Sequence, residues 1–353
     1  MPIVLDGSNG ITQAEQFNSD STFGFKNRII NGAMVIDQRN AGASVTPTNS
    51  QYLLDRWQAA LSAASKYSVQ QNAGSVTPPV GFSKYLGVTS LSSYSVGAGD
   101  FFIVQQKIEG FNTADLAWGT ANAKTVTLSF QIYSSLTGTF SGSIYNETGT
   151  RRYFPFTYTV NLANTWSQIS VVVTGSVDGT WTTDNSSGLV VGFSLGVGST
   201  YGGQTANTWT GTSSFGVLSA NSVVGTNGAT FYITGVQLEV GSTATSFDYR
   251  PYGTELALCQ RYFEVIGVDS QSLFADTYSN TGNVAIYSGA YNVNKRAVPT
   301  LTQFGTFTAS FTDSVFNVRP SKQGFSMWYG TGGTGRSYWY NETNGGIYAT
   351  AEL

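Results

Sequence analysis

Residues 231–265 read FYITGVQLEVGSTATSFDYRPYGTELALCQRYFEV, and this stretch decides how the rest of the chain is divided. Its first part has the alternating apolar pattern of a strand, with Phe231 and Ile233 at odd positions. From Val236 onward the apolar residues stand at even positions instead. Since successive side chains in a strand point to opposite faces, this change of parity indicates one inserted residue. Gly235 stands at the change, so we predict a β-bulge there.

The second part of the stretch has the pattern of a short helix. Thr254 is a residue type that caps helix N-termini, and Glu255 would then lie in the first turn, where negative charge is favourable. Leu256, Cys259 and Phe263 follow at spacings of three and four, which places them on one apolar stripe. The stretch as a whole therefore predicts a link between two β-domains.

The composition favours an all-β protein. The 353 residues are enough for two domains, and only 10% of them are charged. Glycine occurs 41 times and aromatic residues make up 14% of the chain, a combination typical of strands joined by tight turns. Strand-like alternation is clear at residues 126–132 and 189–195, where every second residue is apolar. Short alternating strands without a repeat of constant length predict a sandwich or jelly roll rather than a β-helix.

Charge and cysteine content argue against several classes of partner and compartment. The net charge is −3, the sequence pI is about 5.0 and no basic stripe occurs, so no nucleic-acid partner is predicted. No secretory signal is visible at the start, and no apolar run is long enough for membrane insertion. The single cysteine, Cys259, excludes an internal disulfide framework and is expected to be buried. We therefore expect synthesis in a reducing cytoplasm without a signal peptide.

The sequence offers little catalytic or metal-binding chemistry. It contains no histidine, which excludes Ser-His-Asp and Cys-His nucleophilic sites, and no zinc site is expected. The loops at Asp178-Gly179 and Asp184-Asn185 are interpreted as ordinary turns rather than calcium ligands. We predict no catalytic residue, no metal and no cofactor. A carboxylate pair suited to glycan hydrolysis is not recognisable from sequence spacing, because such a pair meets only through the fold.

A glycine-rich segment at residues 330–337 matches the pattern G-x-G-x-x-G, yet we do not predict nucleotide binding there. That motif requires a helix after the glycines, and here Tyr338, Trp339 and Tyr340 continue as a strand. We expect strands at 325–329 and 337–340 to pair as a hairpin with an exposed loop.

Sugar binding through aromatic side chains is the chemistry that remains. Sugar rings have apolar C–H faces that stack on Trp and Tyr, while their hydroxyl groups need polar partners. We predict one group of glycan contacts near the C-terminal loop: Trp328, Tyr329, Arg336, Tyr338 and Tyr340. A weaker candidate group lies in loops of the first domain: Trp181, Tyr201 and Trp209. An aromatic residue in a strand packs in a core more often than it binds a ligand, so packing is the alternative for both groups.

Several short segments together resemble a family of bacteriophage and prophage tail-fibre or receptor-binding proteins. They include NRIING, DQR and DRW in the first sixty residues and QLEVG in the opening stretch. In full they are residues 5–11, 27–32, 37–39, 55–57, 105–110, 124–130, 237–241, 247–252, 256–263 and 348–353. Taken in this order, they are distributed along the chain, and the resemblance extends over most of residues 1–353.

The resemblance implies an all-β architecture in four parts. Residues 1–25 would be an N-terminal virion-attachment arm, and residues 26–250 a large jelly-roll β-sandwich like a carbohydrate-binding module. Residues 251–264 would be a linker with a short helix, and residues 265–353 a smaller C-terminal β-sandwich. Because the apolar residues of the helix share one side, we expect it to dock between the domains as a fixed joint rather than a hinge.

The resemblance also implies a role in the virion tail. The protein would be a structural, non-enzymatic subunit that attaches the phage to host-surface polysaccharide. Its other partners would be copies of itself in a homotrimer and other tail proteins bound through the N-terminal arm. Two alternatives stay open: a tailspike that hydrolyses polysaccharide with paired carboxylates, and a connector or capsid-surface fibre without a receptor role. The family supplies no ligand residues to carry over, so the candidate contacts depend on the aromatic argument alone.

Overall fold

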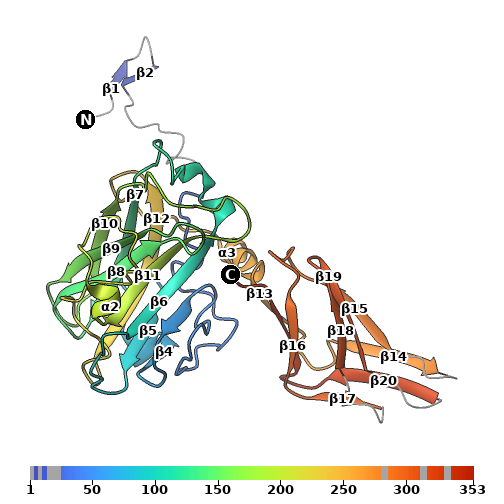
Figure 1. Ribbon diagram of the computed structural model, residues 1–353. Coiled ribbons are helices and arrows are strands. Elements are labelled where there is room, and N and C mark those ends of the chain that lie inside the picture. Colours follow the sequence, from blue (N-terminus) through green and yellow to red (C-terminus); the bar gives the residue numbers. More distant parts are fainter. Residues whose placement is uncertain (1–3, 7–9, 14–24, 280–284, 311–315, 330–334) are drawn as a thin grey trace.

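The computed structural model is almost entirely β-structure, as predicted, and its two sandwiches are joined by one helix (Figure 1). It describes residues 4–6, 10–13, 25–279, 285–310, 316–329 and 335–353. A two-stranded ribbon of β1 (Val4–Asp6) and β2 (Gly10–Gln13) precedes the first domain. Most of the remaining predicted arm lies outside the described residues.

The first domain is a jelly-roll sandwich of two five-stranded antiparallel sheets. One sheet has the order β10 (Ser167–Val173), β7 (Val126–Ser134), β12 (Thr230–Val240), β5 (Leu86–Ser90) and β4 (Tyr67–Gln71). The other has the order β3 (Gln58–Leu61), β6 (Phe101–Glu109), β11 (Ser187–Val197), β8 (Gly138–Tyr145) and β9 (Tyr153–Val160). Short helical turns lie between strands: η1 (Ala73–Ser75), η2 (Gly110–Asn112), η3 (Ala114–Leu116) and α2 (Ser199–Gly202). The two apolar faces recognised in the sequence, at 126–132 and 189–195, belong to β7 and β11 and are fully buried in the core.

The predicted bulge is present in β12. The register between β12 and β7 shifts between Thr234 and Gln237, and Gly235 between them has a φ of +61°. A Cβ atom on Gly235 would lie 2.5 Å from the ring of Phe82. Glycine is therefore required both by the left-handed backbone and by the packing of this ring.

The bulge attaches an earlier segment of the chain to β12. The amide of Val236 donates to the carbonyl of Gly32 at 3.0 Å, and the Val236 carbonyl accepts from the side-chain amide of Asn27 at 3.0 Å. A Cβ atom on Gly32 would lie 2.2 Å from that same carbonyl oxygen. The segment 27–32 thus lies directly against the irregular part of the strand.

Helix α3 (Tyr252–Gln260) links the two domains and begins earlier than predicted. Pro251 is its N-cap residue, so Thr254 lies inside the helix and the predicted Thr254 cap is wrong. The fixed φ of proline is compatible with entry into a helix, which allows the helix to begin before the threonine. Glu255 occupies the first turn as expected, and Cys259 is fully buried in an apolar cluster that includes residues of the first domain.

The tail of the chain returns to the first domain and completes the joint. Arg56 is buried, forms an ion pair with Glu352, and lies 3.5 Å over the ring of Tyr262. Arg39 pairs with the same carboxylate and lies 3.7 Å over the ring of Phe263. Both ends of the second domain are therefore tied to the first, which is the arrangement expected of a fixed joint.

Two further arginines bridge the domains. Arg261 donates two hydrogen bonds of 3.0 Å to the carboxylate of Glu109 in β6. Arg296 donates to the carbonyl of Asn185 at 2.6 Å and to the carbonyl of Glu352 at 2.8 Å. The joint thus combines a helix anchored by the buried Cys259 with a network of charge-assisted hydrogen bonds.

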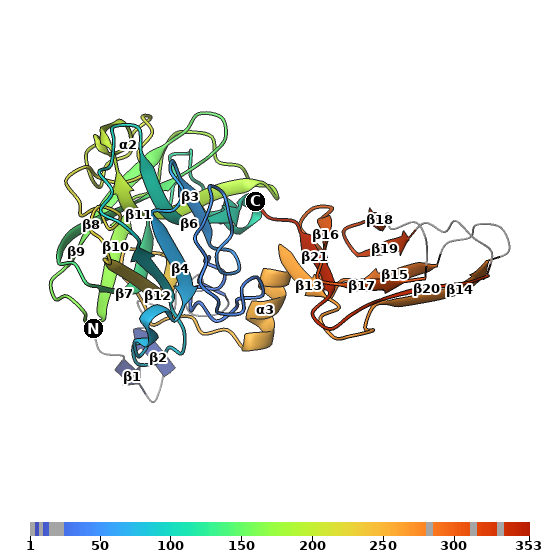
Figure 2. The same cartoon turned by 90° about the horizontal axis from the view of Figure 1, so that it is seen from below.

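The second domain is the smaller β-sandwich and projects from the first beyond α3 (Figure 2). Its described residues form three antiparallel sheets of three strands each. Their orders are β13 (Phe263–Ile266), β21 (Gly346–Thr350) and β16 (Thr300–Phe304); β14 (Phe274–Ser279), β20 (Gly335–Asn341) and β17 (Phe307–Ala309); and β15 (Ile286–Ala290), β19 (Gly324–Tyr329) and β18 (Phe316–Pro320).

The predicted hairpin between 325–329 and 337–340 is wrong. Strand β19 pairs with β15 and β18, whereas β20 pairs with β14 and β17, so the two strands belong to different sheets. Both strands turn a large side chain inward, and Tyr329 and Trp339 pack with ring centroids 5.7 Å apart in the shared core. Residues 330–334 of the expected loop lie outside the described residues.

Replacing Gly235 with alanine is expected to destabilise the first domain by about 2 kcal/mol or more, because of left-handed strain and displacement of the Phe82 ring. The measurement is the free energy of unfolding from chemical denaturation. Gly253→Ala is the control, since Gly253 lies in α3 with open space around it and should gain up to about 1 kcal/mol. Equal stability of the two variants would contradict the importance assigned to the bulge.

Replacing Glu352 with alanine is expected to cost about 3–5 kcal/mol in unfolding free energy, because it leaves the buried charge of Arg56 without its partner. Asp178→Ala serves as the control, because its ion pair with Arg152 is exposed and screened by solvent. Chemical denaturation of both variants measures the difference. A Glu352→Ala protein as stable as Asp178→Ala would show that the tail does not hold the joint.

Candidate functional site

The structure does not bring the five predicted C-terminal residues to one place. In β19 the side chain of Tyr329 is buried in the core, so the neighbouring Trp328 points outward from that sheet. In β20 Trp339 and Asn341 are buried, so Tyr338 and Tyr340, which alternate with them, point outward from a different sheet. Trp328 and the two tyrosines are each partly exposed, on the outer faces of two sheets.

Three of the predicted residues, together with three from β14, form one outer surface of the sheet β14-β20-β17. The strand register pairs Phe274 with Tyr340, Asp276 with Tyr338 and Tyr278 with Arg336. We call this surface the aromatic face; its members are Phe274, Asp276, Tyr278, Arg336, Tyr338 and Tyr340. Strands β14 and β20 extend to the end of the domain farthest from the first sandwich (Figure 2).

The aromatic face combines open rings with one central ion pair. The rings of Tyr338 and Tyr340 are nearly parallel, with centroids 6.3 Å apart and planes at 9°. Arg336 pairs with Asp276 at 2.7 Å, and this hydrogen-bonded contact lowers the pKa of the Asp276 carboxyl group. Tyr278 is 72% exposed. The surface therefore offers flat apolar rings beside donors and acceptors of hydrogen bonds.

The half of this face that β14 supplies was not predicted from the sequence. The segment FADTYS carries the signal in its alternation, since Phe274, Asp276 and Tyr278 occupy every second position. That alternation shows that the three side chains share a face, but it does not reveal which strand lies beside them.

Trp328 lies on the outer face of the sheet β15-β19-β18. The guanidinium of Arg319 lies 5.0 Å from the centre of its ring, and Ile286 is its cross-strand partner. This surface is a separate location from the aromatic face, and a glycan contact at Trp328 stays a prediction.

The weaker candidate group is also divided. Trp181 and Trp209 lie together, with ring centroids 5.6 Å apart, and both pack on Trp118 at the edge of the first domain's core. Their indole N–H groups donate to the carbonyls of residues 178 and 174. Tyr201 instead packs against Phe101 and Phe215. All three side chains have packing partners. Their role as glycan contacts stays a prediction.

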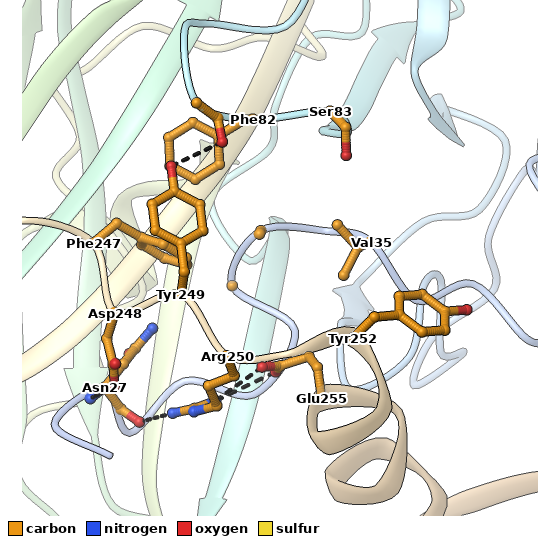
Figure 3. Close-up of a pocket in the computed structure, with 13 residues that line it drawn as sticks. Asn27, Val35, Phe82, Ser83, Phe247, Asp248, Tyr249, Arg250, Tyr252 and Glu255 are labelled. Carbon is orange, nitrogen blue, oxygen red and sulfur yellow. Dashed lines mark hydrogen bonds and ion pairs between the residues drawn. The ribbon is translucent and has the colours of Figure 1, made fainter. Parts of the chain in front are cut away.

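A third location, which the sequence analysis did not identify, is a cavity of about 530 Å³ at the joint between the domains (Figure 3). Its walls come from the segment 27–35, the loop 81–83, and the linker and first turn of α3 at 247–255. We call it the joint cavity. Its lining residues are Asn27, Gly32, Ala33, Val35, Gly81, Phe82, Ser83, Phe247, Asp248, Tyr249, Arg250, Tyr252 and Glu255.

The polar face of β12 holds the linker wall of the joint cavity in place. Gln237 and Glu239, both buried, accept the backbone amides of Asp248 and Thr245 at 2.8 Å. These bonds fix the loop that carries the aromatic residues of the cavity. The position of the cavity thus follows from the same strand that contains the bulge.

Three aromatic rings form one wall of the joint cavity. Phe247 meets Phe82 at 5.2 Å and Tyr249 at 4.9 Å between ring centroids, and the Phe82 ring covers the bulge at Gly235. The hydroxyl group of Tyr249 donates to the carbonyl of Gly81 at 2.8 Å. Tyr252 stands on the opposite side of the hollow (Figure 3).

The charged residues of the joint cavity are held by defined bonds. Arg250 pairs with Glu255 at 3.2 Å and donates to the carbonyl of Ile29 at 3.1 Å. Asp248 accepts the amide of Asn27 on one carboxylate oxygen at 3.2 Å. No hydrogen bond to the other oxygen occurs among the described residues, so it is available to a ligand.

The described part of the chain has neither a metal-binding cluster nor a membrane-spanning helix. No group of three or more acidic or cysteine side chains there is arranged to hold a metal ion. Of the two candidate calcium loops, Asp178 pairs with Arg152 and Asp184 accepts hydrogen bonds from Ser186. No helix within the described ranges is long and apolar enough to cross a bilayer.

Comparisons with known proteins find likeness only among solved structures. No protein family matches the sequence, and no curated protein does. The chain is similar to the enzymatically active domain of tailspike protein 4 of bacteriophage CBA120, with 12% identity, a TM-score of 0.34, and coverage of 61% of this chain and 22% of that chain. The match therefore spans less than a quarter of the tailspike chain.

Two sugar-binding proteins are also similar to the chain. A CBM4 carbohydrate-binding module shares 18% identity, with a TM-score of 0.30 and coverage of 60% of this chain and 98% of that chain. A putative sugar binding protein from Bacteroides thetaiotaomicron shares 10% identity, with a TM-score of 0.36 and coverage of 61% and 100%. At this level of similarity no residue role transfers, and the functional argument depends on the geometry of this chain.

Proposed function

We propose that the protein is a bacteriophage tail-fibre or receptor-binding subunit that attaches the virion to glycan on the host surface. The observation that carries this proposal is the aromatic face, an open surface of rings around an ion pair on the projecting domain. The sequence resemblance to phage tail proteins supports the viral setting.

The chemistry of the aromatic face suits a saccharide. The rings of Tyr338 and Tyr340 offer apolar area to the C–H faces of sugars. Arg336 and Asp276 supply donors and acceptors for the hydroxyl groups. Because the surface is open and shallow, each contact is weak, and tight attachment would come from several copies that bind together.

The proposal includes an assembly. A homotrimer anchored through the N-terminal arm to other tail proteins would present three aromatic faces at the end of the fibre. Binding rather than hydrolysis is proposed, because the aromatic face contains a single carboxylate, Asp276, and glycoside hydrolysis uses two.

The double variant Tyr338→Ala and Tyr340→Ala is expected to weaken binding of the purified protein to host cells by roughly 30-fold, since two rings at about 1 kcal/mol each are lost. The measurement is cell binding by fluorescently labelled protein, with competition by purified host polysaccharide. Phe111→Ala is the matched control, because Phe111 is an exposed ring on the first domain.

Unchanged binding by the double variant would contradict the aromatic face as the site. Failure of the unaltered protein to bind host cells, or to compete with phage adsorption, would contradict the receptor role itself. Release of reducing ends from the polysaccharide would show a hydrolase instead.

A further inference from the structure

We propose that the joint cavity is a second saccharide site, separate from the aromatic face, and that it takes a single neutral or amino sugar residue. The cavity has a volume of about 530 Å³, within the range of small-molecule sites in proteins. It is formed by three segments that lie far apart in the chain and are brought together on the first domain and at the start of α3. The inference depends on this geometry and goes beyond the attachment role proposed above.

The walls of the joint cavity present aromatic rings from two sides. Tyr249 and Tyr252 are 58% and 63% exposed, and they line the cavity from the linker and from the start of α3. In Figure 3 the ring of Tyr252 extends away from Tyr249. Exposed aromatic rings are suited to the apolar face of a sugar. A ligand in the cavity would lie against the wall that contains Tyr249, with Tyr252 at its rim.

Small residues keep the space between these walls open. Gly32 and Ala33 line the cavity with little side-chain volume, and Gly32 is held against β12 by the hydrogen bond from the Val236 amide. Gly81 is fixed by the hydroxyl group of Tyr249, and a Cβ atom there would lie 2.6 Å from that oxygen. At these positions the backbone itself therefore forms part of the cavity wall.

The charges of the joint cavity decide which sugars fit. Two carboxylates and one guanidinium line it, and Arg250 is already paired with Glu255. The remaining charge is that of Asp248, whose free oxygen can accept a hydroxyl or ammonium donor. A uronate or sialate would place a second negative charge beside it, so acidic sugars should be excluded.

The test is saturation-transfer NMR on the full chain with free sugars as probes: glucose, galactose, N-acetylglucosamine, glucosamine, glucuronate and N-acetylneuraminate. We expect transfer to at least one neutral or amino sugar and none to the two acidic sugars. Tyr252→Ala should raise the Kd of that sugar about fivefold or more by removing one ring. Ser83→Trp, at an exposed position on the rim, should abolish binding by filling the cavity.

A charge variant gives an independent readout. Asp248→Asn keeps the side-chain oxygen that accepts the Asn27 amide and removes only the charge, so glucuronate should begin to bind. Leu162→Ala, at an exposed position outside the cavity lining, is the control and should bind the free sugar as the unaltered chain does. The double variant Tyr338→Ala and Tyr340→Ala removes the rings of the aromatic face, so the transfer that persists in it reports on the joint cavity.

The outcomes separate this proposal from the attachment role. The joint-cavity site is overturned if no neutral or amino sugar shows transfer, or if Ser83→Trp shows the same transfer as the unaltered chain. Host-cell binding tests the aromatic face independently of this result. Loss of sugar binding only in the tyrosine double variant would place the sugar on the aromatic face, and this result would also overturn the joint-cavity site.

Discussion

The buried guanidinium of Arg56 is the interaction on which the arrangement of the two domains depends. A charge in a protein interior is costly unless it is paired, and here the Glu352 carboxylate, the Tyr262 ring and the carbonyl of Lys107 at 2.6 Å surround it. Tyr262 follows α3, and Glu352 belongs to the tail of the chain. The charge is therefore satisfied only when both ends of the second domain are in place, which fixes the direction in which the aromatic face points.

A second constraint is the single extra residue in β12. Because Gly235 is inserted, Val236 no longer pairs with β7 and instead holds the segment 27–32. The ring of Phe82 packs against the bulge at Gly235. Gln237 and Glu239 hold the loop that carries the other two rings of this wall, Phe247 and Tyr249. The joint cavity is thus a consequence of the irregularity that the sequence displays as a change of parity.

Local patterns in the sequence predicted what depends on local rules. The all-β class, the bulge at Gly235, the buried Cys259 and the inner faces of β7 and β11 all follow from alternation and residue type. The sequence pattern could not assign strand partners, because pairing depends on contacts across the whole domain; hence the hairpin was wrong and Trp328 was grouped with Tyr338. The joint cavity was missed for the same reason, since its walls come from three distant segments.

Hydrogen–deuterium exchange of the full chain, with and without purified host-surface polysaccharide, tests the central claim most directly. If the aromatic face attaches the virion to glycan, backbone amides of β14 and β20 should be protected by the polysaccharide, while those of β10, on an outer edge of the first domain, should not change. Saturating polysaccharide that leaves β14 and β20 unprotected would contradict the account.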